Sequence, residues 1–194
     1  MSSPLAVINR GLVRLGVPPL ASLSDADAQA LAAATLYEEI KEAELATFPW
    51  SFALRETALP LLNVPSGDER WTGFDYTYQL PTGNLRVLGL TNYDAFKLTG
   101  DQLHTNTENA RLVYIENVGE QNWPKYFQKV VSFEFAASVA ISITDNSQRA
   151  DLMYNQALQA RRAARSIDSQ QTPHTVLQLM RIYQKPSYNP LTSG

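Results

Sequence analysis

The chain has 194 residues, with 16 basic and 19 acidic side chains, a formal net charge of −3 and no cysteine. Without cysteine it forms no disulfide scaffold, thiolate zinc site, iron–sulfur cluster or cysteine nucleophile. The small acidic surplus argues against a dedicated duplex-DNA binder, which needs basic side chains to neutralise phosphates. With 44 % apolar and 18 % charged residues, the composition is that of a globular protein with a sizeable core.

No membrane segment is expected from the sequence. The first ten residues lack the basic region that precedes the apolar core of a secretory signal. The longest weakly charged apolar stretch, residues 130–143, is too short to cross a bilayer and contains Glu134. We therefore expect a soluble protein with no membrane partner.

Two helices are predicted at the start of the chain. The first covers residues 4–15, with Ser3 as its cap and Pro4 in its first turn, and ends before Gly16. The second covers residues 25–48, with alanines along its apolar stripe, which lets a neighbouring helix approach closely.

Between residues 51 and 121 the apolar period shortens toward two, as in Phe74, Tyr76, Tyr78 and Leu80, which alternate with polar residues. The tripeptide Thr99-Gly100-Asp101 is typical of a hairpin turn. The pattern predicts a small antiparallel β region inserted between helices, with short strands at 52–59, 85–90, 95–98, 102–105 and 111–116.

Two further helices are predicted at residues 123–143 and 147–168. The first is apolar on nearly every side, which is typical of a central helix packed on more than one flank. The second has one apolar stripe, made of Ala150, Met153, Ala157, Ala160, Ala164 and Ile167. Beyond it, residues 169–194 are polar and contain prolines, with one possible short helix at 175–183.

The predicted fold class is α+β, mainly α: a four-helix bundle with an inserted small antiparallel β region and an extended C-terminal arm. The bundle and its insertion form one body, residues 1–168. The arm covers residues 169–194.

Candidate chemistry is sparse, and the sequence predicts no catalytic residue, metal ligand or cofactor. His104 and His174 are the only histidines, they are 70 positions apart, and both are expected to be ordinary surface residues. Glu134 has a strongly apolar neighbourhood, where burial would raise its pKa. It is expected to pair with an arginine such as Arg10 or Arg14 rather than to act in catalysis.

Charge is divided unevenly along the chain. Residues 1–146 carry ten basic and seventeen acidic side chains, whereas residues 147–194 carry six and two. The basic cluster is Arg161, Arg162 and Arg165. It either complements the dipole at its helix terminus or contacts a partner or nucleic acid, and the sequence leaves both open. The acidic cluster of the second helix includes Glu38, Glu39 and Glu42.

Several short segments, taken in order, resemble one family. They are Ala6–Arg10, Leu15–Leu20, Ser22–Asp25, Phe48–Ala53, Tyr78–Pro81, Leu85–Val87, Gly100, Tyr114–Ile115 and Trp123–Phe127. Together they are similar to the tail tubular protein A family, the head–tail adaptor (connector) proteins of short-tailed bacteriophages. The likeness covers residues 4 to about 167, and it consists of packing and turn positions rather than a chemical motif.

The resemblance implies a structural virion protein that is not an enzyme. Such proteins form a ring, commonly twelvefold, between the portal protein of the filled head and the tail nozzle or tail tube protein, with DNA passing through without specific binding. It places the chain at the head–tail junction of the virion, and in the host cytoplasm during assembly. Glu38, Glu39 and Glu42 are then candidates to face the channel, since an acidic surface leaves DNA mobile.

The C-terminal arm is expected to bind the portal or a neighbouring subunit. Its candidate contacts are Leu179, Ile182, Tyr183, Lys185, Tyr188 and Leu191, together with the basic cluster. Two other functions stay open: a phage-associated peptidoglycan hydrolase, which needs Glu134 exposed in a cleft, and a monomeric binding module.

Overall fold

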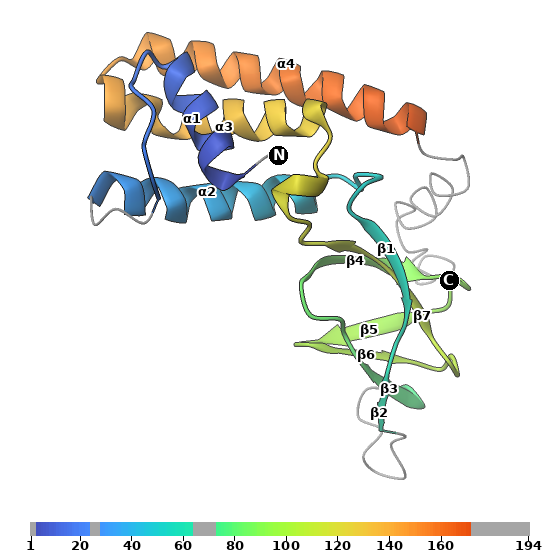
Figure 1. The fold of residues 1–194 in the computed structure, drawn as a ribbon. Helices are drawn as coiled ribbons and strands as arrows, with labels where there is room; N and C mark the ends of the chain where they lie inside the picture. The colour runs from blue at the N-terminus through green and yellow to red at the C-terminus, as the bar shows by residue number, and fades with distance from the viewer. Residues whose placement is uncertain (1–2, 24–27, 64–72, 172–194) are drawn as a thin grey trace, which may run out of the picture. The chain divides into compact units, whose positions relative to one another are not determined.

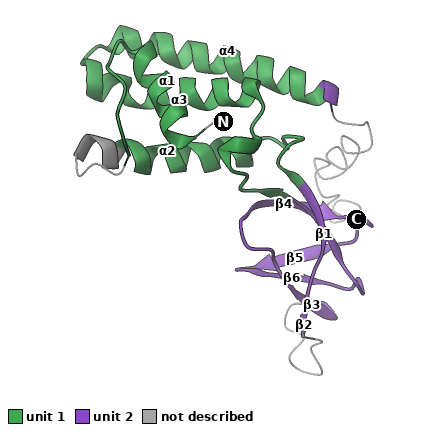
Figure 2. Cartoon of the chain, viewed as in Figure 1, with its two compact units in different colours: residues 1–54, 115–169 green, residues 55–114, 170–194 purple. Residues whose placement is uncertain are grey.

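The computed structural model describes residues 3–23, 28–63 and 73–171 (Figure 1). The chain divides into two compact units (Figure 2). The helical unit comprises residues 1–54 and 115–169. The β unit comprises residues 55–114 together with 170–194, of which 170 and 171 are described.

The described residues of the chain form four α-helices: α1 (Pro4–Arg14), α2 (Ala28–Thr47), α3 (Lys125–Thr144) and α4 (Ser147–Gln171). All four predicted helices are therefore confirmed, with ends that differ by a few residues. A 3-10 turn at Glu120–Asn122 precedes α3. Across the described ranges, no helix is long and apolar enough to cross a membrane.

The first helix begins and ends as its sequence predicts. The Ser3 hydroxyl accepts a hydrogen bond from the Ala6 amide at 3.3 Å, and Pro4 occupies the first turn. Gly16 follows the helix with φ +73°, a left-handed conformation that favours glycine. At Gly11 the helix lies so close to α3 that a Cβ atom would stand 2.8 Å from Cδ1 of Phe135. Glycine is therefore a packing requirement at this crossing.

Helix α3 is central to the helical unit, as its apolar character predicts. Phe127, Val130, Val131 and Phe135 are all fully buried on it. The helix continues through the Val-Ala-Ile-Ser-Ile segment and stops at Asp145, whose backbone is left-handed (φ 47°).

Helix α4 buries most of the predicted stripe, with one exception. Ala150, Met153, Ala157, Ala160 and Ala164 are buried, but Ile167 is 43 % exposed. Asp168 is fully buried in its place. The rotation of the last turns therefore puts a carboxylate, not an isoleucine, against the helical unit.

The described residues of the β region contain seven strands: β1 (Leu54–Ala58), β2 (Leu61–Asn63), β3 (Tyr76–Gln79), β4 (Asn84–Leu90), β5 (Phe96–Thr99), β6 (Gln102–Thr105) and β7 (Arg111–Glu116). One sheet has the order β1-β7-β4, and the other has the order β2-β3-β6-β5. The predicted hairpin at Gly100 is confirmed, because Thr99 pairs with Gln102 and φ of Gly100 is +60°.

The predicted fold class is wrong. The structure is a mixed fold of helices and two antiparallel sheets, not a four-helix bundle with a small β region. Taken one at a time, the short strands indicate a minor insertion. Together, however, they enclose a separate apolar core drawn from both sheets, with Tyr78 and Leu103 on one sheet and Leu90 and Leu112 on the other. This shared core makes the β region a unit of its own.

Candidate functional site

The helical unit contains a charged cluster that joins three helices. Arg161 on α4 binds Glu44 on α2 through two hydrogen bonds, from Nε to Oε2 at 3.2 Å and from Nη2 to Oε1 at 2.5 Å. The same Nη2 also contacts Oε1 of Glu134 on α3. One guanidinium therefore holds two carboxylates, and we call these three residues the Arg161 cluster.

The expected partner of Glu134 was wrong, although an ion pair does form. Arg10 donates instead to Oε1 of Gln128 at 2.8 Å. Arg14 lies over the ring of Phe133, 4.2 Å from its centroid. Arg161 lies 27 positions from Glu134, and no pattern in the sequence connects the two.

The Arg161 cluster carries more negative than positive charge. The Glu44 side chain is only 6 % exposed and the Glu134 side chain 15 %. Burial raises the pKa of Glu134, and the nearby Glu44 carboxylate raises it further, while Arg161 partly opposes both. Hydrogen bonding to Glu44 raises the pKa of Arg161, so this side chain stays charged.

A pH dependence follows from the raised pKa of Glu134. The folded state takes up this proton at a higher pH than the unfolded chain, so stability increases as pH falls through the raised pKa and is lost above it. We expect Glu134→Gln, which mimics the protonated form, to abolish this gain on acidification from neutral pH through the mildly acidic range. Urea midpoints measured across that range, with the exposed Glu39→Gln as control, test the sign. A wild-type protein that loses stability relative to Glu134→Gln on acidification would contradict it.

A second buried polar group lies between α2 and the 3-10 turn. The Tyr37 hydroxyl donates to Oε1 of Glu120 at 3.0 Å, and Nζ of Lys41 lies 3.4 Å from the same oxygen and 2.9 Å from Glu38. Burial raises the pKa of Tyr37, and the Glu120 carboxylate adds to the effect. Burial lowers the pKa of Lys41, but its bonds to Glu38 and Glu120 outweigh this and leave it raised.

The predicted basic cluster does not form a single patch. Arg161 is occupied inside the Arg161 cluster, and the Arg165 guanidinium lies over Phe48, 5.3 Å from the ring centroid. Arg162 is exposed. The three arginines therefore have three different environments.

The acidic residues proposed for the channel are all exposed on α2. Glu38 pairs with Lys41, and Oε1 of Glu42 accepts a hydrogen bond from the Asn117 side chain at 3.0 Å. The arm contacts Leu179, Ile182, Tyr183, Lys185, Tyr188 and Leu191 lie outside the described residues.

His104 is not the surface residue that was expected, because it is 3 % exposed. It lies on β6, a central strand, and its Nδ1 is 3.0 Å from the Thr77 hydroxyl on β3. Burial lowers the pKa of His104, with a contribution from Lys97. His174 lies outside the described part of the chain. Within that part, no group of three or more potential metal ligands comes together.

Asp168 is a polar anchor that the sequence did not indicate. It accepts hydrogen bonds from the Ser51 amide (2.9 Å), the Ser51 hydroxyl (2.8 Å) and the Tyr126 hydroxyl (2.6 Å). Burial raises the pKa of Tyr126, and the hydrogen bond to Asp168 reinforces this. The sequence feature that points to a buried Asp168 is its position four residues after Ala164, which continues the buried stripe of α4.

Next to this anchor, aromatic rings from two distant segments form one cluster. Trp50 lies with its ring centroid 4.9 Å from those of both Phe48 and Phe127. Phe127 is also 4.9 Å from Phe52 and 4.8 Å from Trp123. We call this group the aromatic cluster.

No protein-family profile and no curated protein sequence matches the chain.

Proposed function

We propose that this protein is a head–tail adaptor of a short-tailed bacteriophage. Copies of it form the ring that joins the portal of the head to the tail nozzle or tail tube and lets DNA pass through its channel. The proposal starts from the ordered set of segments that resemble the tail tubular protein A family. It places the protein in the virion, at the head–tail junction.

The observation that carries the proposal is the aromatic cluster. Two of the most distinctive resembling segments, residues 48–53 and 123–127, lie about seventy positions apart in the sequence. Trp50 and Phe52 from the first segment both pack on Phe127 from the second, with ring centroids 4.9 Å apart in each pair. Segments that were selected only for their order in the chain are therefore direct packing partners. This supports the view that the resemblance reflects a common helical unit.

The exposed acidic side chains of α2 support the channel role. Glu38, Glu39 and Glu42 are all exposed. A negatively charged wall repels phosphates and leaves DNA free to slide. In the adaptor, this side of α2 faces the channel.

Reconstitution with the portal tests the proposal. The full-length chain is mixed with the portal protein encoded in the same genome, and electron microscopy is used to look for a ring on the portal. We expect portal-capped rings, and we expect Glu42→Lys to assemble equally well but to slow DNA ejection at low ionic strength. The same type of change at an exposed acidic residue of the β unit, Glu108→Lys, is the control and should alter neither property.

Two results would argue against an adaptor. One is a chain that stays monomeric and unbound when portal is in excess. The other is peptidoglycan hydrolysis that Glu134→Gln abolishes while the helical content is retained, which would favour the hydrolase instead.

A further inference from the structure

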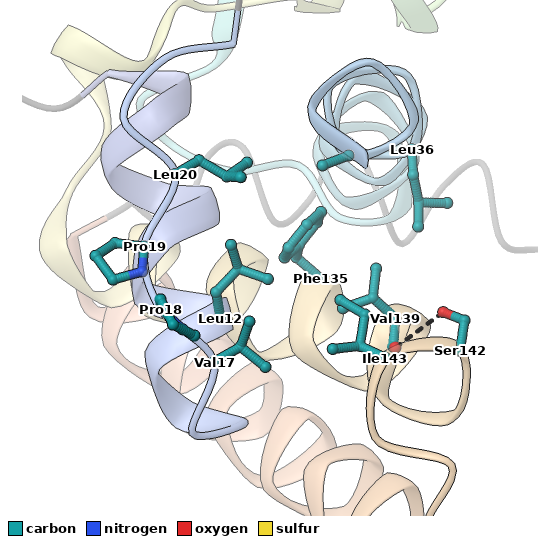
Figure 3. A pocket seen from close by; sticks show the side chains of 11 residues that line it. Leu12, Val17, Pro18, Pro19, Leu20, Leu36, Phe135, Val139, Ser142 and Ile143 are labelled. Carbon is teal, nitrogen blue, oxygen red and sulfur yellow. Dashed lines mark hydrogen bonds between the residues drawn. The ribbon is translucent and has the colours of Figure 1, made fainter. Parts of the chain in front are cut away.

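The helical unit contains an apolar groove of about 600 Å³ that no described side chain fills (Figure 3). Its walls come from the end of α1, the segment after it, α2 and the last turns of α3. The principal lining side chains are Leu12, Leu20, Leu36, Phe135, Val139 and Ile143. The volume falls within the range of sites that take a ligand or a peptide side-chain cluster.

The chemistry of the lining selects an apolar occupant. Ser142 is the polar side chain among the lining residues, and its hydroxyl already donates to the Val139 carbonyl at 3.0 Å. A polar or charged ligand would therefore lose its hydration without gaining partners. An apolar side chain has no hydrogen bonds to water to lose on entry.

The segment that follows α1, residues 15–20, forms one wall of the groove and is held in place by hydrogen bonds. The side chain of Asn9 donates to the Leu20 carbonyl at 2.9 Å and accepts from the Leu20 amide at 2.8 Å. The Val17 amide bonds to the Leu12 carbonyl, and Nη1 of Arg149 on α4 donates to the Leu15 carbonyl at 2.9 Å. The groove is thus formed before anything binds, which lowers the entropic cost of binding.

The chain itself contains a segment with matching chemistry. In the last 23 residues, Val176, Leu179, Met180 and Tyr183 are spaced i, i+3, i+4 and i+7. This is the spacing with which an amphipathic helix places one apolar face in a groove. The segment also carries Arg181 and Lys185 and no acidic residue.

Charge on the groove wall complements this segment. On α2, Glu39 lies one turn beyond the lining residue Leu36 and is exposed. A basic segment bound in the groove would approach this carboxylate, whereas an acidic peptide would be repelled.

If the C-terminal segment is helical, it is too short to lie along the groove of its own chain. The groove lies beside the start of α4, since Ile143 lines it and Arg149 contacts the adjoining wall. Helix α4 then runs for 25 residues, or about 37 Å, before the segment begins. The four residues 172–175 reach back at most about 14 Å. A helix over residues 176–183 adds about 12 Å to that reach, so it falls short of the Ile143 end and cannot lie along its own groove.

We propose that the groove between α1, α2 and α3 binds the C-terminal segment of a second copy of this chain, through Val176, Leu179, Met180 and Tyr183. Each copy then offers a groove at one end of α4 and a segment at the other. Such a contact is heterologous, so it links copies head to tail and closes into a ring when the rotation permits. The inference does not depend on what the ring does.

Site-specific crosslinking tests this inference with the full-length protein. The natural chain has no cysteine, so each introduced cysteine is unique. Ser142→Cys labels the groove, and Gln178→Cys labels the segment beside its apolar stripe. When the two single variants are mixed with a short bismaleimide, we expect a crosslinked dimer. Its yield should exceed by about tenfold that of a control in which Ser166→Cys, exposed on the far part of α4, replaces Ser142→Cys.

Adding Leu179→Asp to the segment variant should reduce the yield to the control level, since a carboxylate cannot enter the apolar groove. This change lies outside the helical unit, so the test does not depend on a groove variant that fails to fold. Three results would overturn the inference: a yield equal to the Ser166→Cys control, a yield insensitive to Leu179→Asp, and crosslinking only within a single chain carrying both cysteines. Portal binding that persists in any of these cases would leave the adaptor proposal standing.

Discussion

Replacement of Arg161 by methionine is expected to lower the free energy of unfolding of the helical unit by about 3–5 kcal/mol. The change preserves the apolar length of the side chain but removes the guanidinium that Glu44 and Glu134 share. Two buried carboxylates would then face each other without a counter-charge. The penalty is large because an uncompensated buried charge costs more than the ion pair itself contributes.

Urea denaturation followed by circular dichroism at the helical band measures this effect. The matched control is Arg162→Met, the same change one position along α4 at an exposed side chain, where we expect a shift within about 0.5 kcal/mol. Combining Arg161→Met with Glu134→Gln should recover part of the loss, because one of the two charges is removed. Equal effects of the two single arginine variants would show that the Arg161 cluster is not essential to the helical unit.

The helices were predictable because their signals are local. The cap at Ser3, the break at Gly16 and the stripe from Ala150 to Ala164 each depend on residues within a few turns of one another. Rotation within the last turns is harder to predict, and this is why the stripe was extended to Ile167 instead of Asp168. Successive residues of a helix are about 100° apart around its axis. A modest rotation of the last turns of α4 therefore decides whether Ile167 or Asp168 faces the helical unit.

The β region and the charged contacts depended on distant residues. Nothing near β3 or β6 in the sequence indicates that Tyr78 and Leu103 share a core with the other sheet, so the region seemed minor. His104 was assigned to the surface because strand order, which makes β6 central, is not encoded locally. Arg161 and Glu44 are 117 positions apart, and either arginine of α1 was as plausible a partner for Glu134. Residue type predicted that an ion pair would form, but only the packing of three helices selects the pair.

Truncation of Phe127 to alanine is expected to cost about 3–5 kcal/mol, the range for a large aromatic side chain in a core. Phe127 is fully buried, and its ring contacts those of Trp50, Phe52 and Trp123. Its loss leaves a cavity between residues 48–53 and residues 123–127 of the helical unit. The buried tryptophans Trp50 and Trp123 report this change through their fluorescence during denaturation.

Phe133→Ala provides the matched control, since it is the same substitution on the same helix at a half-buried side chain. There the ring lies under the Arg14 guanidinium, so its removal costs a cation–π contact of about 0.5–1 kcal/mol and a smaller apolar area. The difference between the two variants isolates the aromatic cluster from the general effect of losing a phenylalanine. If Phe127→Ala cost no more than Phe133→Ala, the packing of residues 48–53 on 123–127 would not hold the helical unit together. The aromatic cluster would then no longer support the adaptor proposal.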